Sequence, residues 1–212
     1  MEVGCADSIW LPYFGKELGF SVAGIDYSKT GCERARITLK DAGVEAPVYQ
    51  ADMFDPPAEL VGQFDVVFSY GLVEHFEDTA AAVSALVRLL STSGLVITII
   101  PNMAYLNGAL QRLLNRRIYE LHVPLRLHQL TDAHRAAGLI VDSERHLLSC
   151  NFGLLIAGSE TEPFIVQGVK RTLQSGLIAC QFPLWWFESK GFALVAPNRW
   201  TSPYLAVVAK RS

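Results

Sequence analysis

Small residues and a carboxylate follow the first two apolar runs of the chain. The opening stretch, MEVGCADS, places Gly4 in a turn, and SVAGID ends on Asp26, 22 residues after Gly4. Glycine lets a backbone turn tightly beside a ligand, and a carboxylate about 20 residues further on accepts hydrogen bonds from a ribose diol. This spacing predicts a nucleoside-binding turn, and a purely structural glycine is the alternative. Ala6 and Ser8 stand where further glycines would be more permissive.

Two later apolar runs also end on polar residues. PVYQADMFD and FDVVFSYGLVEHFED carry carboxylates, hydroxyl groups and an imidazole directly after their apolar residues. Carboxylates accept hydrogen bonds from amino and hydroxyl groups, and an imidazole titrates in the range useful to a general base. The residues concerned are Asp52, Met53, Ser69, Tyr70, Gly71, Glu74 and His75.

These polar residues need elements that bring them together. The first half of the chain alternates continuous apolar runs with helix-like stretches, which is typical of parallel strands covered by helices. In such α/β folds, ligands bind at the carboxyl ends of the strands. Ser28 is expected to cap one of the helices, and Gly43 to end it. The expected strands are residues 2–5, 21–26, 47–52, 64–70 and 94–100, and the expected helices are 9–19, 28–43 and 77–90.

The second half of the chain is less regular. Its pattern predicts helices over residues 104–121, 131–139 and 163–176, with Thr131 or Asp132 capping the second of them. It predicts strands over residues 139–150 and 202–211. Because no linker or repeat divides the chain, we expect a single domain over residues 1–212, with a cofactor-binding half at 1–102 and a substrate-binding half with the final strands at 103–212.

Four stretches in order, EVGCADS, AGIDYS, QADMFD and FDVVFSYGLVEHFED, resemble the class I S-adenosylmethionine-dependent methyltransferases. The resemblance is to the small-molecule branch that includes the type 11/12 and quinone-biosynthesis enzymes, and it covers roughly residues 1–145. It implies a Rossmann-like, doubly wound α/β fold whose seven-stranded sheet is mostly parallel, with helices on both faces and an antiparallel last strand. It also implies an enzyme that uses S-adenosyl-L-methionine to methylate a small molecule, expected at oxygen.

The same resemblance assigns the cofactor contacts. Glu2 and Gly4 would frame the methionine end, Asp26 would hold the ribose hydroxyls, and Asp52 would accept from the adenine amino group. The full set implied is Glu2, Gly4, Ala6, Asp26, Tyr27, Asp52, Met53, Ser69, Tyr70 and Gly71. Members of the family normally have a helix before the first strand. We therefore expect that N-terminal helix to be absent here, and the cofactor pocket to be open on that side.

His75 is the candidate catalytic base because it follows the fourth strand at the mouth of the expected site. The alternative is that His75 caps or packs the following helix. The candidate acceptor-binding residues lie in the second half and are Tyr105, Tyr119, His122 and Arg126. The five histidines show no HxH or HExxH spacing, so no metal site is expected.

Charge separates the two halves of the chain. Residues 1–102 carry 6 Lys and Arg against 14 Asp and Glu, and residues 103–212 carry 12 against 7. The acidic half agrees in sign with a cationic cofactor. An acidic acceptor could be attracted by four arginines of the other half, Arg112, Arg116, Arg117 and Arg126. Solvated faces are the alternative for both. The net charge of −3 argues against nucleic acid as a partner.

The rest of the composition limits where the protein can be located and what it can contact. No apolar run approaches the roughly 20 residues of a membrane span. Four scattered cysteines without a CxxC pair suggest reduced thiols and a cytoplasmic location. The WWF run at residues 185–187 suits a core, a homodimer contact or a lipid-facing edge. Two other functions stay open: a non-catalytic, methyltransferase-like partner subunit, and a nicotinamide-dependent oxidoreductase, which gives no reason for QADMFD.

Overall fold

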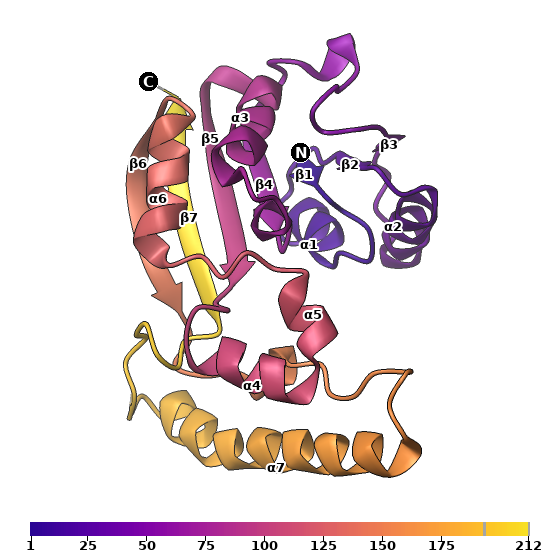
Figure 1. Cartoon of the computed structure of the whole chain (residues 1–212). Helices are drawn as coiled ribbons and strands as arrows, with labels where there is room; N and C mark the ends of the chain where they lie inside the picture. The colour runs from indigo at the N-terminus through magenta and orange to yellow at the C-terminus, as the bar shows by residue number, and fades with distance from the viewer. Residues whose placement is uncertain (193, 212) are drawn as a thin grey trace.

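The alternating apolar runs form the strands of one sheet (Figure 1). The computed structural model describes residues 1–192 and 194–211. The strand order is β3-β2-β1-β4-β5-β7-β6, and β7 is antiparallel to both of its neighbours while the other pairs are parallel. The strands are β1 (Glu2–Val3), β2 (Gly24–Asp26), β3 (Val48–Gln50), β4 (Phe64–Tyr70), β5 (Leu90–Pro101), β6 (Leu139–Leu147) and β7 (Tyr204–Arg211). The predicted mostly parallel, seven-stranded sheet is confirmed.

Helices of the first half form where the sequence predicts them. They are α1 (Trp10–Lys16), α2 (Lys29–Ala42) and α3 (Thr79–Leu89). Ser28 caps α2, its hydroxyl accepting a hydrogen bond from the Gly31 N–H, and Gly43 ends the helix in the left-handed conformation that favours glycine. The cap and the stop both follow from local sequence, so these bounds are confirmed.

The two faces of the sheet carry different helices. Along β4, Val67 belongs to the core that the sheet shares with α3 and α6 (Leu127–Ala136). The next residue, Phe68, packs against Trp10 and Phe14 of α1, with ring centroids 5.6 and 5.1 Å away. Successive side chains of a strand point to opposite faces. The apolar run of β4 therefore holds helices on both sides, as predicted.

The helix predicted over residues 104–121 is wrong in one respect: it is two helices, α4 (Leu106–Leu114) and α5 (Arg116–Glu120). Asn115 between them has an extended backbone, and its side-chain oxygen accepts a hydrogen bond from the Ile118 N–H. Its amide group also donates to the Gly158 carbonyl. Asparagine favours such capping positions over helix interiors, so the helical backbone is interrupted at Asn115. The apolar residues keep a helical spacing on both sides of the break, and for this reason the sequence predicted a single helix.

The cap predicted for the next helix is also wrong, because α6 begins at Leu127. The backbone N–H of Arg126 donates to the Gln129 side chain at the start of the helix. Thr131 is instead fully buried within α6. A threonine can occupy a helix interior where tertiary burial outweighs its preference for a cap.

A long helix lies between β6 and β7 and is the largest difference from the prediction. The helix α7 (Phe164–Ser189) includes the WWF run and has Pro183 inside it. Figure 1 shows α7 along the bottom of the view, with α4 between it and the sheet. No helix within residues 1–192 or 194–211 is both long and apolar enough to cross a membrane. All four cysteines are free thiols, three of them buried and Cys180 exposed.

Candidate functional site

The carboxyl ends of β1, β2 and β3 meet at a cavity of about 480 Å³. Five residues predicted to bind a cofactor line it: Gly4, Asp26, Tyr27, Asp52 and Met53. Six apolar residues to which the sequence gave no binding role also line it: Val3, Ile25, Ala51, Phe54, Leu72 and Phe76. The lining of the cavity thus combines two carboxylates with apolar side chains.

The turn after β1 is shaped by Gly4 and by the Asp26 carboxylate. Gly4 has a φ of +76°, and a Cβ there would lie 3.2 Å from a Leu72 methyl group. The Ala6 and Ser28 N–H groups donate to the two Asp26 oxygens at 3.0 and 2.8 Å. A carboxylate offers about four lone-pair sites, so roughly two stay available to a ligand. Ala6 therefore orients Asp26 through its backbone.

Asp52 and its neighbours form the far end of this cavity. The Asp52 side chain is exposed and accepts a hydrogen bond from the Phe54 N–H at 2.9 Å, which orients the carboxylate. The Phe54 and Phe76 rings meet edge to face, with centroids 5.2 Å apart. Met53 is buried in the core, whereas Tyr27 is 80% exposed. A flat apolar ligand group would find its contacts at Phe54 and Phe76.

A second cavity, of about 330 Å³, lies on the other side of Gly4. Its lining includes Glu2, Gly4, Ser8, Trp10 and Tyr70. The Glu2 side chain is only 2% exposed, and its Oε2 atom has no hydrogen-bond partner within the described residues. Burial raises the pKa of Glu2 to about 7. A buried carboxylate oxygen without a partner is costly, so this cavity favours a cationic or hydrogen-bond-donating ligand at Glu2 Oε2.

The end of β4 supplies the next part of the wall. The Ser69 hydroxyl is buried and unpartnered among the described residues. The Tyr70 ring packs against those of Trp10 and Tyr204, with centroids 5.8 and 5.6 Å away. Burial, with a contribution from Tyr204, raises the pKa of Tyr70, so its phenol is neutral. Gly71 follows in the left-handed conformation.

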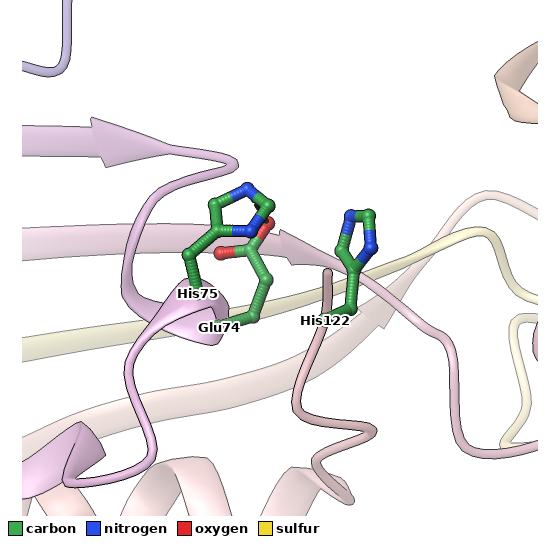
Figure 2. A group of neighbouring side chains, drawn as sticks. All are labelled: Glu74, His75 and His122. Atoms are coloured by element: carbon green, nitrogen blue, oxygen red, sulfur yellow. Dashed lines mark ion pairs between the residues drawn. The ribbon is translucent and has the colours of Figure 1, made fainter. Parts of the chain in front are cut away.

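Three ionisable side chains gather beyond β4 (Figure 2). Glu74 and His75 belong to the short helix η2 (Val73–His75), and His122 follows α5. The two imidazole centroids are 4.7 Å apart. Glu74 is 1% exposed with both oxygens unpartnered in the described structure, and burial raises its pKa to about 8. Burial also lowers the pKa of His122.

The predicted acceptor-site residues do not all reach this cluster. His122 contacts His75, but the ring of Tyr105 packs against Trp200, with centroids 5.1 Å apart. Tyr119 is half-buried on α5, and Arg126 is exposed at the start of α6. The sequence placed Glu74 just after the fourth strand but assigned it no specific role, because its burial depends on the tertiary structure. Its position next to His75 was the one available signal.

Residues 1–98 match a family described as a methyltransferase domain. A ubiquinone biosynthesis O-methyltransferase from Vibrio campbellii is 32% identical over 94 residues, covering 44% of this chain and 40% of that protein. One of the same description from Pseudomonas aeruginosa is 30% identical over 149 residues, covering 66% of this chain and 64% of that protein. The chain thus spans less than two thirds of the length of either relative.

The fold has solved counterparts. A SAM-dependent methyltransferase from Archaeoglobus fulgidus superposes with a TM-score of 0.60 at 18% identity, over 99% of this chain and 84% of that one. The likeness therefore extends through the second half, although the family match ends at residue 98.

Proposed function

We propose that the chain is a class I S-adenosylmethionine-dependent methyltransferase and that it transfers a methyl group from S-adenosyl-L-methionine to an oxygen atom of a small molecule. The observation that carries the proposal is the pair of cavities that adjoin at Gly4. One has the carboxylates and apolar wall that suit a nucleoside. The other has a buried carboxylate, one oxygen of which has no partner among the described residues, and this suits a cation.

The residues at the two cavities fit the cofactor in complementary ways. Asp26 and Asp52 would accept hydrogen bonds from the ribose hydroxyls and the adenine amino group, with Tyr27, Met53 and Phe54 near the base. Glu2 would accept from the ammonium group of the methionine part. Hydrogen bonds to charged groups contribute roughly 1.5–3 kcal/mol each. Ser69, Tyr70 and Gly71 would line the same end of the cofactor.

Catalysis then needs an aligned acceptor and a group that takes its proton. The bound cofactor supplies a methyl group on a positively charged sulfur, ready for in-line displacement. His75 would take the acceptor's proton on Nε2, because its Nδ1 lies 2.8 Å from the Leu121 carbonyl and donates to it. The acceptor would lie among Tyr105, Tyr119, His122 and Arg126. The curated relatives are named as O-methyltransferases, which supports oxygen as the methylated atom.

The finer features of the acceptor and the assembly belong to the same proposal. An acidic acceptor is favoured by Arg126, which is exposed and forms no ion pair with any described residue. A homodimer is favoured by the exposed Trp186 and Phe187 of α7. A single domain, with halves at 1–102 and 103–212, is favoured by the continuous sheet, since β5 of the first half pairs with β7 of the second. The cytoplasmic location stays a prediction.

Calorimetric titration with S-adenosylmethionine, S-adenosylhomocysteine and NADH tests the cofactor. We expect both sulfur compounds to bind at one site per chain and NADH to show no binding. A methyl-transfer assay with hydroxylated aromatic acceptors then tests the reaction. Binding of NADH alone would refute the proposal in favour of an oxidoreductase. Cofactor binding without transfer to any acceptor would favour a non-catalytic partner subunit.

A further inference from the structure

The helix α7 is attached to the rest of the molecule by polar side chains. Three of them form hydrogen bonds with the backbone of residues 150–155, namely Gln174, Gln181 and Trp185. The Gln181 side-chain oxygen accepts from the Phe152 N–H at 2.7 Å, and within α7 only Gln181 is buried. The three residues are seven and four positions apart, so they share one face of the helix. These bonds therefore fix which face of α7 points inward.

The opposite face of α7 is apolar and exposed. At its start, Phe164 and Ile165 are 86% and 78% exposed, and near its end Phe182 and Trp186 are each more than half exposed. Of the charged residues of the helix, only Arg171 adjoins this outer face, and it lies at the edge. A surface helix normally has the reverse polarity, with its apolar face inward. Since α7 is also the outermost helix in Figure 1, its outer face is a candidate interaction surface.

Side-chain size along the outer face favours a second helix as the occupant. The middle of the face has only small, exposed residues, which are Gly168, Thr172, Ser175, Gly176 and Ala179. Glycine destabilises a helix interior, yet no described atom lies within 4 Å of where a Cβ of Gly168 or Gly176 would be. Packing within the described chain thus gives no reason for either glycine. Small residues let two helix backbones approach closely, whereas on a lipid surface they would bury little apolar area.

A second copy of α7, running antiparallel, matches this face in size and in charge. With a two-fold axis at the middle of the helix, Ile165 of each chain meets Trp186 of the other, and small residues meet small residues. Beyond the helix ends, Glu160 comes close to Lys190 of the second copy. Both are exposed, and neither forms an ion pair with any described residue. A parallel pair would instead place like charges against each other, which is unfavourable.

We propose that two copies of this chain associate through an antiparallel pair of α7 helices, with the outer face of each helix covering that of the other. The pair rests on the homodimer of the proposed function and gives it an element, an orientation and a register. A helix of 26 residues is about 39 Å long. One such pair lies at the low end of specific interfaces, below roughly 1,200 Å² in total, so we expect a dimer that dissociates at micromolar concentrations. Since no described residue of α7 lines either cavity, cofactor binding is independent of the pairing.

Sedimentation equilibrium at chain concentrations from about 1 to about 100 μM tests the pairing. Ile165→Lys and Trp186→Glu should each raise the dissociation constant of the dimer by at least about tenfold, because each sets a charge against an apolar side chain of the second copy. In the double variant the two new charges are opposite in sign and meet across the axis, so association should recover. Ile37→Lys, at an exposed position of α2, is the matched control and should associate as wild type.

A variant in the middle of the face separates the pairing from the fold. Gly176→Leu has free space within the described chain and a better helix former at that position. Its unfolding temperature should therefore equal or exceed that of the wild type under conditions where both are monomeric. Its dissociation constant should nevertheless rise, because the leucine side chain holds the two backbones apart.

Three results would overturn the proposed pair. One is a wild-type chain that stays monomeric over the whole concentration range, and another is wild-type association in both single variants. The third is a double variant that associates no better than either single variant, which would exclude the antiparallel register. If the monomeric wild type floats with phosphatidylcholine and phosphatidylglycerol vesicles and Ile165→Lys does not, the outer face binds lipid instead. Titration of Ile165→Lys with S-adenosylhomocysteine tests the proposed function separately, and its affinity should match the wild type.

Discussion

Glu2 holds a carboxyl group whose ionisation is opposed by burial and would be favoured by a cation. Its pKa is raised from the usual 4.5 to about 7, so below pH 7 the free protein holds it mainly protonated. An ammonium group at its unpartnered oxygen would lower that pKa and release the proton. We predict that S-adenosylhomocysteine binding at about pH 6 releases most of one proton, and that affinity rises as the pH approaches 7.

Calorimetry in two buffers of different ionisation enthalpy measures this release. Glu2→Gln should abolish the buffer dependence, whereas Glu144→Gln, at an exposed position on β6, should keep it. For folding of the ligand-free protein, the pH dependence is opposite to that of cofactor affinity: stability falls as the pH rises. Because the folded pKa is raised, ionisation opposes folding, and stability contributed at low pH is lost as the pH rises from about 4.5 to about 7. Glu2→Gln should remove that loss. Equal proton release in both variants would exclude Glu2 as the group.

Asp26 has two tasks that a matched pair of variants can separate. It accepts hydrogen bonds from the Ala6 and Ser28 N–H groups, and it is proposed to hold the ribose. We predict that Asp26→Asn weakens S-adenosylmethionine binding by roughly ten- to a hundredfold, the equivalent of one charged hydrogen bond. Ser28→Ala removes the cap of α2 at a cost of about 1 kcal/mol in stability. Its cofactor affinity should stay within about twofold of wild type, and an equal loss in both variants would point to loop disorder.

Residues of the candidate site differ in how far sequence could find them. Gly4 and Asp26 have a fixed spacing because Gly4 follows β1 directly and only one helix and the second strand separate it from Asp26. The apolar wall of Phe54, Leu72 and Phe76 has no such spacing, since any large apolar side chain at the right surface would serve. Burial of Glu74 depends on segments folding over it from elsewhere in the chain. Such positions become visible only in the tertiary structure.

Among the elements, those with local signals were predictable and those fixed by tertiary contacts were not. Ser28 and Gly43 mark the ends of α2 in the sequence itself. The break at Asn115 and the start of α6 at Leu127 depend on side-chain bonds within an otherwise helical pattern. The length of α7 was missed because Pro183 and the glycines of that region read as stops. Helix existence was thus easier to predict than helix bounds.

The break at Asn115 positions the element that carries Tyr119 and leads to His122. Its side chain caps α5 and bonds the Gly158 carbonyl, so one residue ties α4, α5 and the segment before α7 together. We predict that Asn115→Ala lowers the free energy of unfolding by about 1–2 kcal/mol. It should also raise the acceptor KM severalfold, because α5 loses its anchor, with little change in cofactor affinity.

A variant that loses the cap of a different helix tests whether the rise in acceptor KM is specific to Asn115. Asp78→Ala removes the cap of α3, whose carboxylate accepts from the Ala81 N–H, at a similar cost in stability. Since α3 carries none of the proposed acceptor residues, its acceptor KM should match the wild type. Steady-state kinetics and urea unfolding on the two variants measure both quantities. A KM change of the same size in Asp78→Ala would mean that general destabilisation is responsible.

Over the whole molecule, the acidic half contains the residues of both cavities. Its formal charge is −8, against +5 for the half that holds α4 to α7. S-adenosylmethionine carries a net positive charge, and S-adenosylhomocysteine, without the sulfonium, carries none. A field that attracts the first ligand leaves the second nearly unaffected, and salt screens it over a Debye length of about 8 Å at physiological ionic strength.

We therefore predict that raising the ionic strength from about 0.01 to about 0.15 M weakens S-adenosylmethionine binding severalfold, and S-adenosylhomocysteine binding less than about twofold. Titrations of both ligands in the same KCl series give the slope of affinity against salt for each. S-adenosylhomocysteine is the control for effects of salt on the protein itself. The difference in slope should persist in Glu2→Gln, because the field comes from the whole acidic half and not from one carboxylate. Parallel slopes for the two ligands would show that the charge asymmetry of the chain does not act on the cofactor.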